Sequence, residues 1–121
     1  MRPTIQVWPL PSLTQPEFEE LFNDIVRTCQ KIERLAVKDQ NDLIVGFPKD
    51  LMEYGLGLDI IVQVFVPLVI PAQNLTAGEN QTHCYKVTQT IGETVRNFFY
   101  RHNLTPRIQC QGSVLPWTID V

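Results

Sequence analysis

The side chains best suited to catalysis or metal binding are few and lie far apart in the sequence. The two histidines, His83 and His102, fall in one predicted helix, where they would stand about five turns apart, too far for a shared metal ion. Cys84 follows His83, but adjacent side chains on a helix point in different directions, which argues against a nucleophile–base pair. Nucleophile-elbow, phosphate-loop and dinucleotide motifs are absent. We therefore expect no metal site and no cofactor.

The three cysteines, Cys29, Cys84 and Cys110, indicate neither a zinc site nor a disulfide framework. They are odd in number, widely spaced and contain no CxxC pair. Two of them fall on apolar stripes of predicted helices, where cysteine usually serves as a small buried hydrophobic residue. We interpret them as core residues.

Four cationic residues could bind a small carboxylate ligand through charge-assisted hydrogen bonds: Arg2, Lys38, Lys49 and Arg107. Arg2 lies near the start of the first predicted strand and Lys38 shortly before the second, which makes these two the first choices. For each of the four, the alternative is an ordinary solvated surface charge.

Composition limits the class of protein. A chain of 121 residues with 44% hydrophobic and 19% charged residues is typical of a single globular domain, here residues 1–121. The net charge of −3 argues against nucleic acid or an anionic membrane surface as partners. An export signal and an apolar run long enough to span a membrane are lacking. We expect a cytoplasmic location.

Periodicity predicts a strand, a helix and two further strands in the first half of the chain. Residues 4–8 alternate as a strand does, and Thr14 with Glu17 forms a capping-box signature that begins an amphipathic helix reaching Ile32. Apolar strands follow at 43–47 and 58–66. The second of these is rich in β-branched residues and reads as buried on both faces.

The second half predicts one long helix and one strand. After a loop at 67–80, a helix begins near Asn80–Thr82 and ends at Asn103, with Pro106 just beyond. A strand at 107–111 ends at Gly112, and the tail could add a short edge strand. The order β-α-β-β-α-β predicts a two-layer α/β sandwich, a four-stranded sheet with two helices on one face. Because the other face would remain apolar, we expect a symmetric oligomer.

Several of these segments resemble the tautomerase superfamily, in particular proteins like macrophage migration inhibitory factor. The similar segments are the first strand, Pro3-Thr4-Ile5-Gln6-Val7, and Pro48-Lys49-Asp50-Leu51-Met52-Glu53-Tyr54-Gly55, which is similar to the family's Pro-x-x-Leu-Met-x-aromatic-Gly hairpin. The resemblance implies a homotrimer of subunits with two β-α-β units each. It also implies keto–enol tautomerisation or isomerisation of a small carbonyl acid, with an N-terminal proline as base and without a cofactor.

The residue before Pro3 departs from the family's pattern. Arg2 stands between Met1 and Pro3, and an initiator methionine is removed efficiently only before small residues. The Pro3 nitrogen is then an amide, whose delocalised lone pair has no basicity. The resemblance therefore implies a catalytic Pro3, with Lys38 or Arg107 orienting the carboxylate, only if the chain is processed to begin at Pro3.

Two other functions remain open at this point. The first is a non-enzymatic binding or scaffold protein that keeps the trimer without the base. The second is an unrelated ferredoxin-like α/β sandwich that acts as a small-ligand sensor or interaction module.

Overall fold

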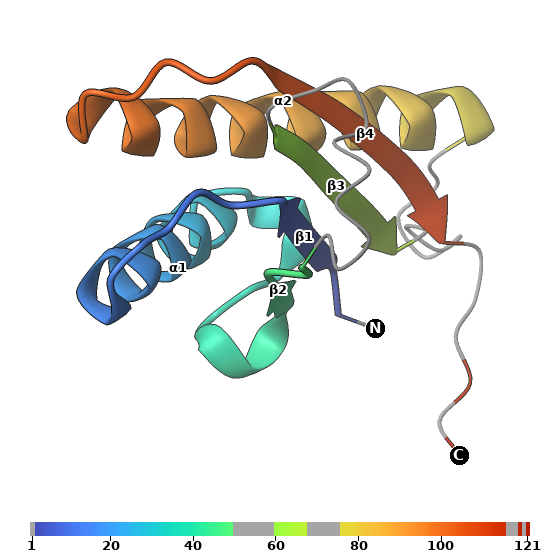
Figure 1. Ribbon diagram of the computed structural model, residues 1–121. Helices are drawn as coiled ribbons and strands as arrows, with labels where there is room; N and C mark the ends of the chain where they lie inside the picture. The colour runs from blue at the N-terminus through green and yellow to red at the C-terminus, as the bar shows by residue number, and fades with distance from the viewer. Residues whose placement is uncertain (1, 50–59, 68–75, 116–118, 120) are drawn as a thin grey trace.

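A computed structural model describes residues 2–49, 60–67 and 76–115, together with residues 119 and 121 (Figure 1). Within them the chain forms a mixed α+β fold. In chain order its elements are β1 (Thr4–Trp8), α1 (Gln15–Gln30), the short 3₁₀ helices η1 (Glu33–Leu35) and η2 (Gln40–Asp42), β2 (Ile44–Gly46), β3 (Ile60–Pro67), α2 (Ala77–Arg101) and β4 (Ile108–Leu115). The predicted alternation of strands and helices is confirmed in these ranges.

The four strands form one sheet in the order β2-β1-β3-β4. β1 is parallel to β2, and β3 is parallel to β4. The two central strands are antiparallel, with Thr4 opposite Phe65 and Trp8 opposite Ile61. A parallel pair needs a crossover, which a helix supplies here in both cases. The fold thus consists of two β-α-β units joined side by side through β1 and β3.

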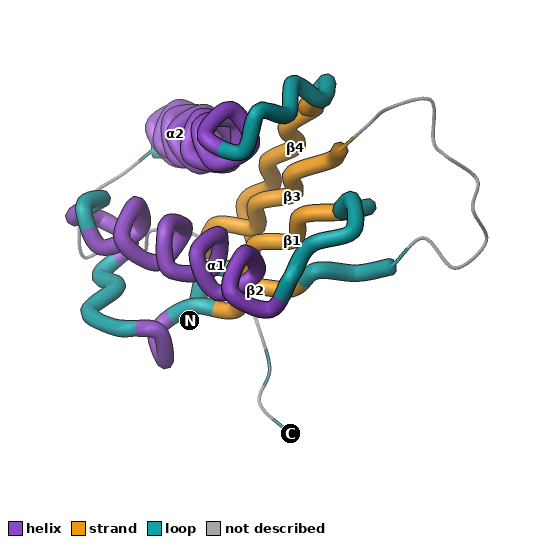
Figure 2. Tube along the Cα trace, turned by 60° about the vertical axis from the view of Figure 1, so that its left-hand side comes forward, coloured by secondary structure: helices purple, strands orange, loops and turns teal. Residues whose placement is uncertain are grey.

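Both helices lie on the same face of the sheet (Figure 2), as predicted. Alternate residues of the central strands, among them Ile5, Val7, Val62 and Val64, point to that face and are fully buried. The helices cover them with their own apolar stripes. The stripe of α1 contributes Leu21, Ile25 and Cys29, and the stripe of α2 contributes Val87, Ile91, Val95, Phe98 and Phe99.

Helix α2 begins earlier than the sequence predicts. Its N-cap is Thr76, whose hydroxyl accepts a hydrogen bond from the Glu79 backbone N–H at 3.1 Å, and not a residue near Asn80–Thr82. The cap satisfies an amide of the first turn that has no partner within the helix. Gly78 in this turn obscured the signal, because glycine usually disfavours a helix.

Strand β4 also extends further than predicted, because it continues through Gly112 to Leu115 in register with β3. A side chain at Gly112 would collide with α2. A Cβ atom at Gly112 would lie 2.3 Å from Thr88 Oγ1 and 3.2 Å from Cys84 Sγ. Gly92 of α2 is crowded in turn, since a Cβ there would lie 2.4 Å from Cys110 Sγ. Glycine lets α2 and β4 approach closely at both points.

The face of the sheet away from the helices carries a polar row. Gln6, Gln63 and Gln111 stand side by side on β1, β3 and β4. The indole N–H of Trp8 donates to Gln63 Oε1 at 2.9 Å, and Gln63 Nε2 donates to Gln111 Oε1 at 3.1 Å. Beside this row Ile61 is buried and Phe65 is partly exposed. This face is therefore less apolar than the sequence of β3 indicates.

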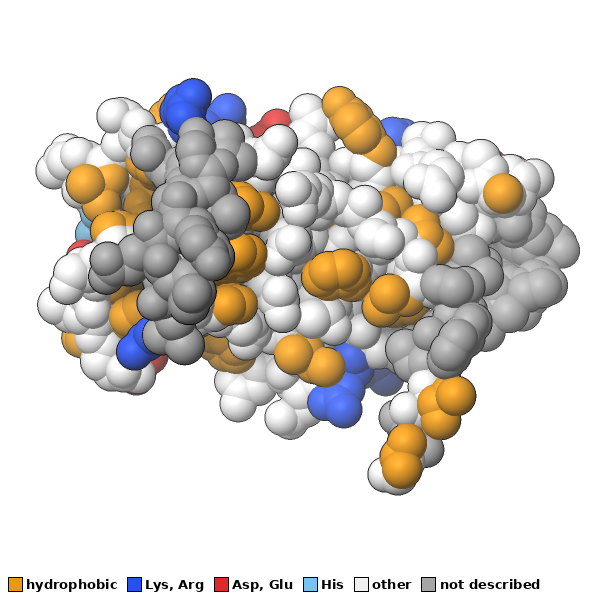
Figure 3. Space-filling model, turned by 45° about the vertical axis from the view of Figure 1, so that its right-hand side comes forward, with side chains coloured by type: hydrophobic (Ala, Val, Ile, Leu, Met, Phe, Trp, Pro, Cys, Tyr) orange, Lys and Arg blue, Asp and Glu red, His pale blue; other side chains and the backbone are white. Residues whose placement is uncertain are grey.

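The surface gives no test of the expected oligomer. On the side seen in Figure 3, hydrophobic side chains form separate spots among polar ones. Most of the Pro48–Gly55 hairpin and the start of the predicted strand at 58–66 lie outside the described residues, as does most of the tail after Leu115. Of the helices in the described part, none has the length and apolarity needed to cross a bilayer.

The close packing of β4 on α2 predicts the effect of filling one of its glycines. Gly112→Ala should destabilise the protein by about 1–3 kcal/mol, because the new methyl group overlaps Thr88 and the packed layers must separate. Chemical denaturation measures this loss. Adding Thr88→Ala should restore part of the stability by removing the closest atom.

Gly78→Ala is the matched control, because a Cβ there meets only Thr76 Oγ1, at 3.9 Å. Its effect should be neutral or stabilising, as expected for alanine in a helix. Equal losses for Gly112→Ala and Gly78→Ala would contradict this account of Gly112.

Candidate functional site

Pro3 lies at the beginning of β1, next to the beginning of β2. Its side chain is buried, and its carbonyl accepts a hydrogen bond from the Ile44 N–H at 2.9 Å. This bond extends the parallel β1–β2 ladder by one step beyond Thr4. The segment before β2 is thereby held against the first residues of the chain.

Asp42, at the end of η2, organises the charges around Pro3. Its carboxylate accepts hydrogen bonds from the backbone N–H of Lys38 at 2.8 Å and of Asp39 at 3.2 Å. These two bonds lower the pKa of Asp42, and the positive charges of Lys38 and Arg2 lower it further. Arg2 and Lys38 therefore each lie within electrostatic range of the Asp42 carboxylate. We call Arg2, Pro3, Lys38 and Asp42 the Pro3 corner.

Arg107 and Lys49 lie away from this corner. The Arg107 carbonyl accepts from the Ile60 N–H at 3.0 Å, at the end of the sheet where β1 finishes with Trp8. Five residues of β1 separate that end from Pro3, which corresponds to roughly 15 Å at the usual rise of a strand. Lys49 follows the far end of β2. Within one chain, Arg2, Pro3 and Lys38 thus lie at the end of the sheet near Asp42, and Arg107 lies at the other end.

The chemistry open to the Pro3 corner is anion binding. Arg2 and Lys38 are both exposed and can donate charge-assisted hydrogen bonds to a carboxylate. The Pro3 nitrogen is acylated by Arg2 and has no proton to exchange. Asp42 is held ionised by its two backbone donors, which makes it a weak base. The corner therefore has cations for a ligand and lacks a group with the basicity for proton transfer.

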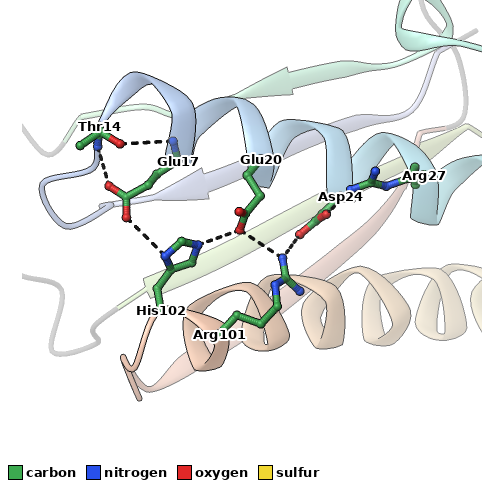
Figure 4. Close-up of polar contacts among 7 residues, drawn as sticks. All are labelled: Thr14, Glu17, Glu20, Asp24, Arg27, Arg101 and His102. Atoms are coloured by element: carbon green, nitrogen blue, oxygen red, sulfur yellow. Dashed lines mark hydrogen bonds and ion pairs between the residues drawn. The ribbon is translucent and has the colours of Figure 1, made fainter.

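A second polar cluster, which the sequence interpretation missed, ties α1 to the end of α2 (Figure 4). His102 lies between two carboxylates of α1: its Nε2 is 2.7 Å from Glu20 Oε2, and its Nδ1 is 3.4 Å from Glu17 Oε2. Arg101 forms ion pairs with Glu20, at 3.3 Å, and with Asp24. From the sequence, His102 was considered as a possible metal ligand together with His83. The pairing depends on how the two helices pack, and the sequence alone does not fix this.

The pKa values of the two glutamates are both lowered by hydrogen bonds. The pKa of Glu17 is lowered mainly by its hydrogen bond from the Thr14 backbone N–H, the second half of the predicted capping box. The pKa of Glu20 is lowered mainly by its bond to His102. The cluster lies across the helix–helix contact and contacts none of the Pro3 corner residues, so we assign it a structural role.

The cysteines do not form a nucleophilic site. Burial raises the pKa of Cys29 to about 12 and also raises the pKa of Cys84 and Cys110, so all three stay protonated near neutral pH. Cys29 and Cys84 are buried as predicted, while Cys110 is exposed as a residue on β4 but turns its thiol toward Gly92 of α2. Within the described ranges, His, Cys, Asp and Glu side chains do not gather in a group that could hold a metal ion.

Comparison with known proteins gives no relative on which to base a function. The sequence matches no protein-family model and no curated protein at a significant level.

The carboxylates of the helix contact predict an acid-sensitive contribution to stability. Because the pKa of Glu20 is lower in the folded protein than its usual 4.5, the unfolded chain takes up its proton first as the pH falls. The free energy of unfolding should therefore decrease from about pH 4.5 downward, until the folded carboxyl is also protonated. Glu20→Gln should flatten this part of the curve in denaturant titrations at a series of pH values.

Glu19→Gln is the matched control, because Glu19 is exposed and accepts a hydrogen bond from Gln15 of the same helix. This variant should show the same acid slope, the decrease in the free energy of unfolding as the pH falls, as the parent protein. An acid slope that Glu20→Gln leaves unchanged would show that the bond to His102 does not persist in solution.

Proposed function

We propose that this protein is a homotrimeric binding protein with a tautomerase-like subunit, which holds a small carboxylate ligand at the Pro3 corner. The observation that carries the proposal is that Arg2 and Lys38 both act on the Asp42 carboxylate, just before the strand whose first residue, Ile44, bonds to the Pro3 carbonyl. In this proposal the protein binds the kind of ligand that a tautomerase binds but performs no proton transfer while Arg2 precedes Pro3.

The arrangement of strands supports the choice of fold. Two β-α-β units joined through an antiparallel central pair are what the resemblance to the migration-factor group leads us to expect of one subunit. The first strand also begins at a proline whose side chain is buried. The homotrimer follows from the same resemblance, and in it Arg107 of a neighbouring subunit could supply the cation that is distant within one chain.

The charges favour a carboxylate over a neutral carbonyl compound as ligand. Arg2 and Lys38 together carry two positive charges, and Asp42 offsets one of them. Asp39, next to Lys38, offsets the other, so a carboxylate would be held by direct contacts with the two cations and not by a net positive charge. Arginine can hold a carboxylate with two parallel hydrogen bonds, whereas lysine contributes a point charge. A ligand carboxylate between them would thus be oriented as well as attracted.

The proposal predicts binding without turnover. The intact chain, its mass verified to include Met1 and Arg2, should bind phenylpyruvate in calorimetric titrations and leave its keto–enol equilibration rate at the uncatalysed value. Lys38→Gln should weaken binding about tenfold through loss of one charge-assisted contact. Lys49→Gln removes an equal charge at a lysine outside the corner and should leave the affinity unchanged.

Deleting Arg2 tests the reason for the lack of turnover. Methionine is removed before proline, so this variant should begin with a free Pro3 amine and gain tautomerase activity, which Pro3→Gly in the same background should abolish. Turnover by the intact chain, with its mass verified, would refute the claim that Arg2 blocks Pro3 as a base. Equal affinity of the Lys38→Gln variant and the parent protein would refute the ligand site.

A further inference from the structure

A cavity lies between the 3₁₀ helix η1 and the first half of α2. Its volume is about 780 Å³, within the usual range for small-molecule sites. One wall comes from Ile32, Glu33 and Arg34, and the other from one face of α2. That face contributes Thr76, Gly78, Glu79, Thr82, His83, Lys86, Val87 and Thr90. The cavity shares no lining residue with the Pro3 corner.

His83 is the unusual residue of this cavity. Its side chain is only 9% exposed, and its Nε2 atom is buried without a hydrogen-bond partner among the described residues. A buried polar atom left in this state costs about as much as a lost hydrogen bond. Such atoms are rare in folded proteins, and each calls for a reason, such as a missing ligand.

The cavity offers cationic groups beside this histidine. The charge of Arg34, on the opposite wall, acts on the His83 ring, and Lys86 stands one helical turn beyond His83 on the same face of α2. The hydroxyl groups of Thr82 and Thr90 already donate to the carbonyls of Gly78 and Lys86. Arg34, Lys86 and the His83 ring therefore remain available as donors to a ligand.

Two acidic residues also line the cavity and limit where an anion can lie. Glu79 is one turn of α2 before His83, and Glu33 precedes Arg34 on η1. Lys86 lies on the other side of His83 from Glu79, which makes the Arg34–His83–Lys86 end the more positive part of the cavity. An anionic group would be attracted to this end and repelled from the Glu79 end.

We propose that the Arg34–His83–Lys86 end of this cavity binds a small ligand through a tetrahedral oxyanion, such as a sulfate or phosphate group. Arg34 supplies a fork of N–H donors that suits such a group, and Lys86 supplies a second charge. The oxyanion gives the His83 ring an acceptor, and it neutralises the guanidinium that otherwise opposes a charge on His83.

Binding in this site is linked to a proton on His83. In the unoccupied protein, burial and the charge of Arg34 lower the pKa of His83, so the ring is neutral near neutral pH. A bound dianion would favour the protonated ring, because it offsets the charges of Arg34 and Lys86 and accepts a hydrogen bond from the ring. The other charges facing the ring, Glu33 and Glu79, are the same in both states. The affinity for the oxyanion should therefore rise as the pH falls.

Sulfate is the probe for this site, because it stays a dianion across the pH range and any proton uptake belongs to the protein. We expect NMR titration of the full-length chain to show sulfate binding with a Kd on the order of 1 mM or tighter. The imidazole resonances of His83 should report a higher pKa with sulfate than without it. Binding should be about tenfold tighter at pH 6 than at pH 8, in line with the linkage.

Arg34→Gln separates a built site from general charge attraction. Arg34 is exposed, so this variant should fold normally, and it should bind sulfate about tenfold more weakly. Arg96→Gln is the matched control, because it removes an equal charge from α2, the helix of His83, but Arg96 lines the cavity between α2 and β4. The proposal would be overturned if the His83 resonances did not shift with sulfate. It would also be overturned if Arg34→Gln and Arg96→Gln lost equal affinity for sulfate.

Discussion

The antiparallel pairing of β1 with β3 is the constraint on which the rest of the structure depends. It joins two β-α-β units into one sheet and fixes their register, with Gln6 opposite Gln63. That register places the start of β1 and the start of β4 at opposite ends of the sheet. The wide separation of Pro3 and Arg107 within a chain is a direct result, as is the row of glutamines across the outer face.

The same pairing brings the two helices together on one face, where a few polar contacts complement the apolar core. Glu17 serves both as the capping residue of α1 and as a partner of His102. The hydroxyl groups of Thr28 and Thr94 meet at 2.7 Å in the same helix contact. These contacts fix the position of one helix along the other, which apolar packing alone leaves loosely defined.

Most of the architecture could be predicted from local signals in the sequence. The Thr14–Glu17 capping box, the apolar stripe of α1 and the β-branched run of β3 each act within a few residues, and each predicted its element correctly. Errors occurred where the deciding atoms are distant in sequence. Gly112 was predicted to end a strand. It instead lets β4 approach Thr88 of α2 closely, and this contact between two elements leaves no local signal in the sequence. Gly78 in the first turn hid the true start of α2.

The sites were less predictable than the fold, for the same reason. Arg2 and Lys38 were singled out by their places before two strands, and the parallel pairing of those strands brought both within electrostatic range of Asp42. Arg107 was chosen as one of four cations that could bind a carboxylate, and the antiparallel β1–β3 register separates it from Pro3 in one chain. His83 gave no sequence signal, because Arg34, on the opposite wall of its cavity, comes from a segment that meets α2 only through the packing of η1.

The most direct test of the central claim is a residue-resolved NMR titration of the intact chain with phenylpyruvate. We predict saturable shifts that centre on Arg2, Lys38 and the Asp42 segment, with the keto and enol signals of the ligand exchanging at the uncatalysed rate. Saturable shifts centred elsewhere in the chain, with the Arg2 and Lys38 signals unmoved, would contradict the assignment of the Pro3 corner as the ligand site.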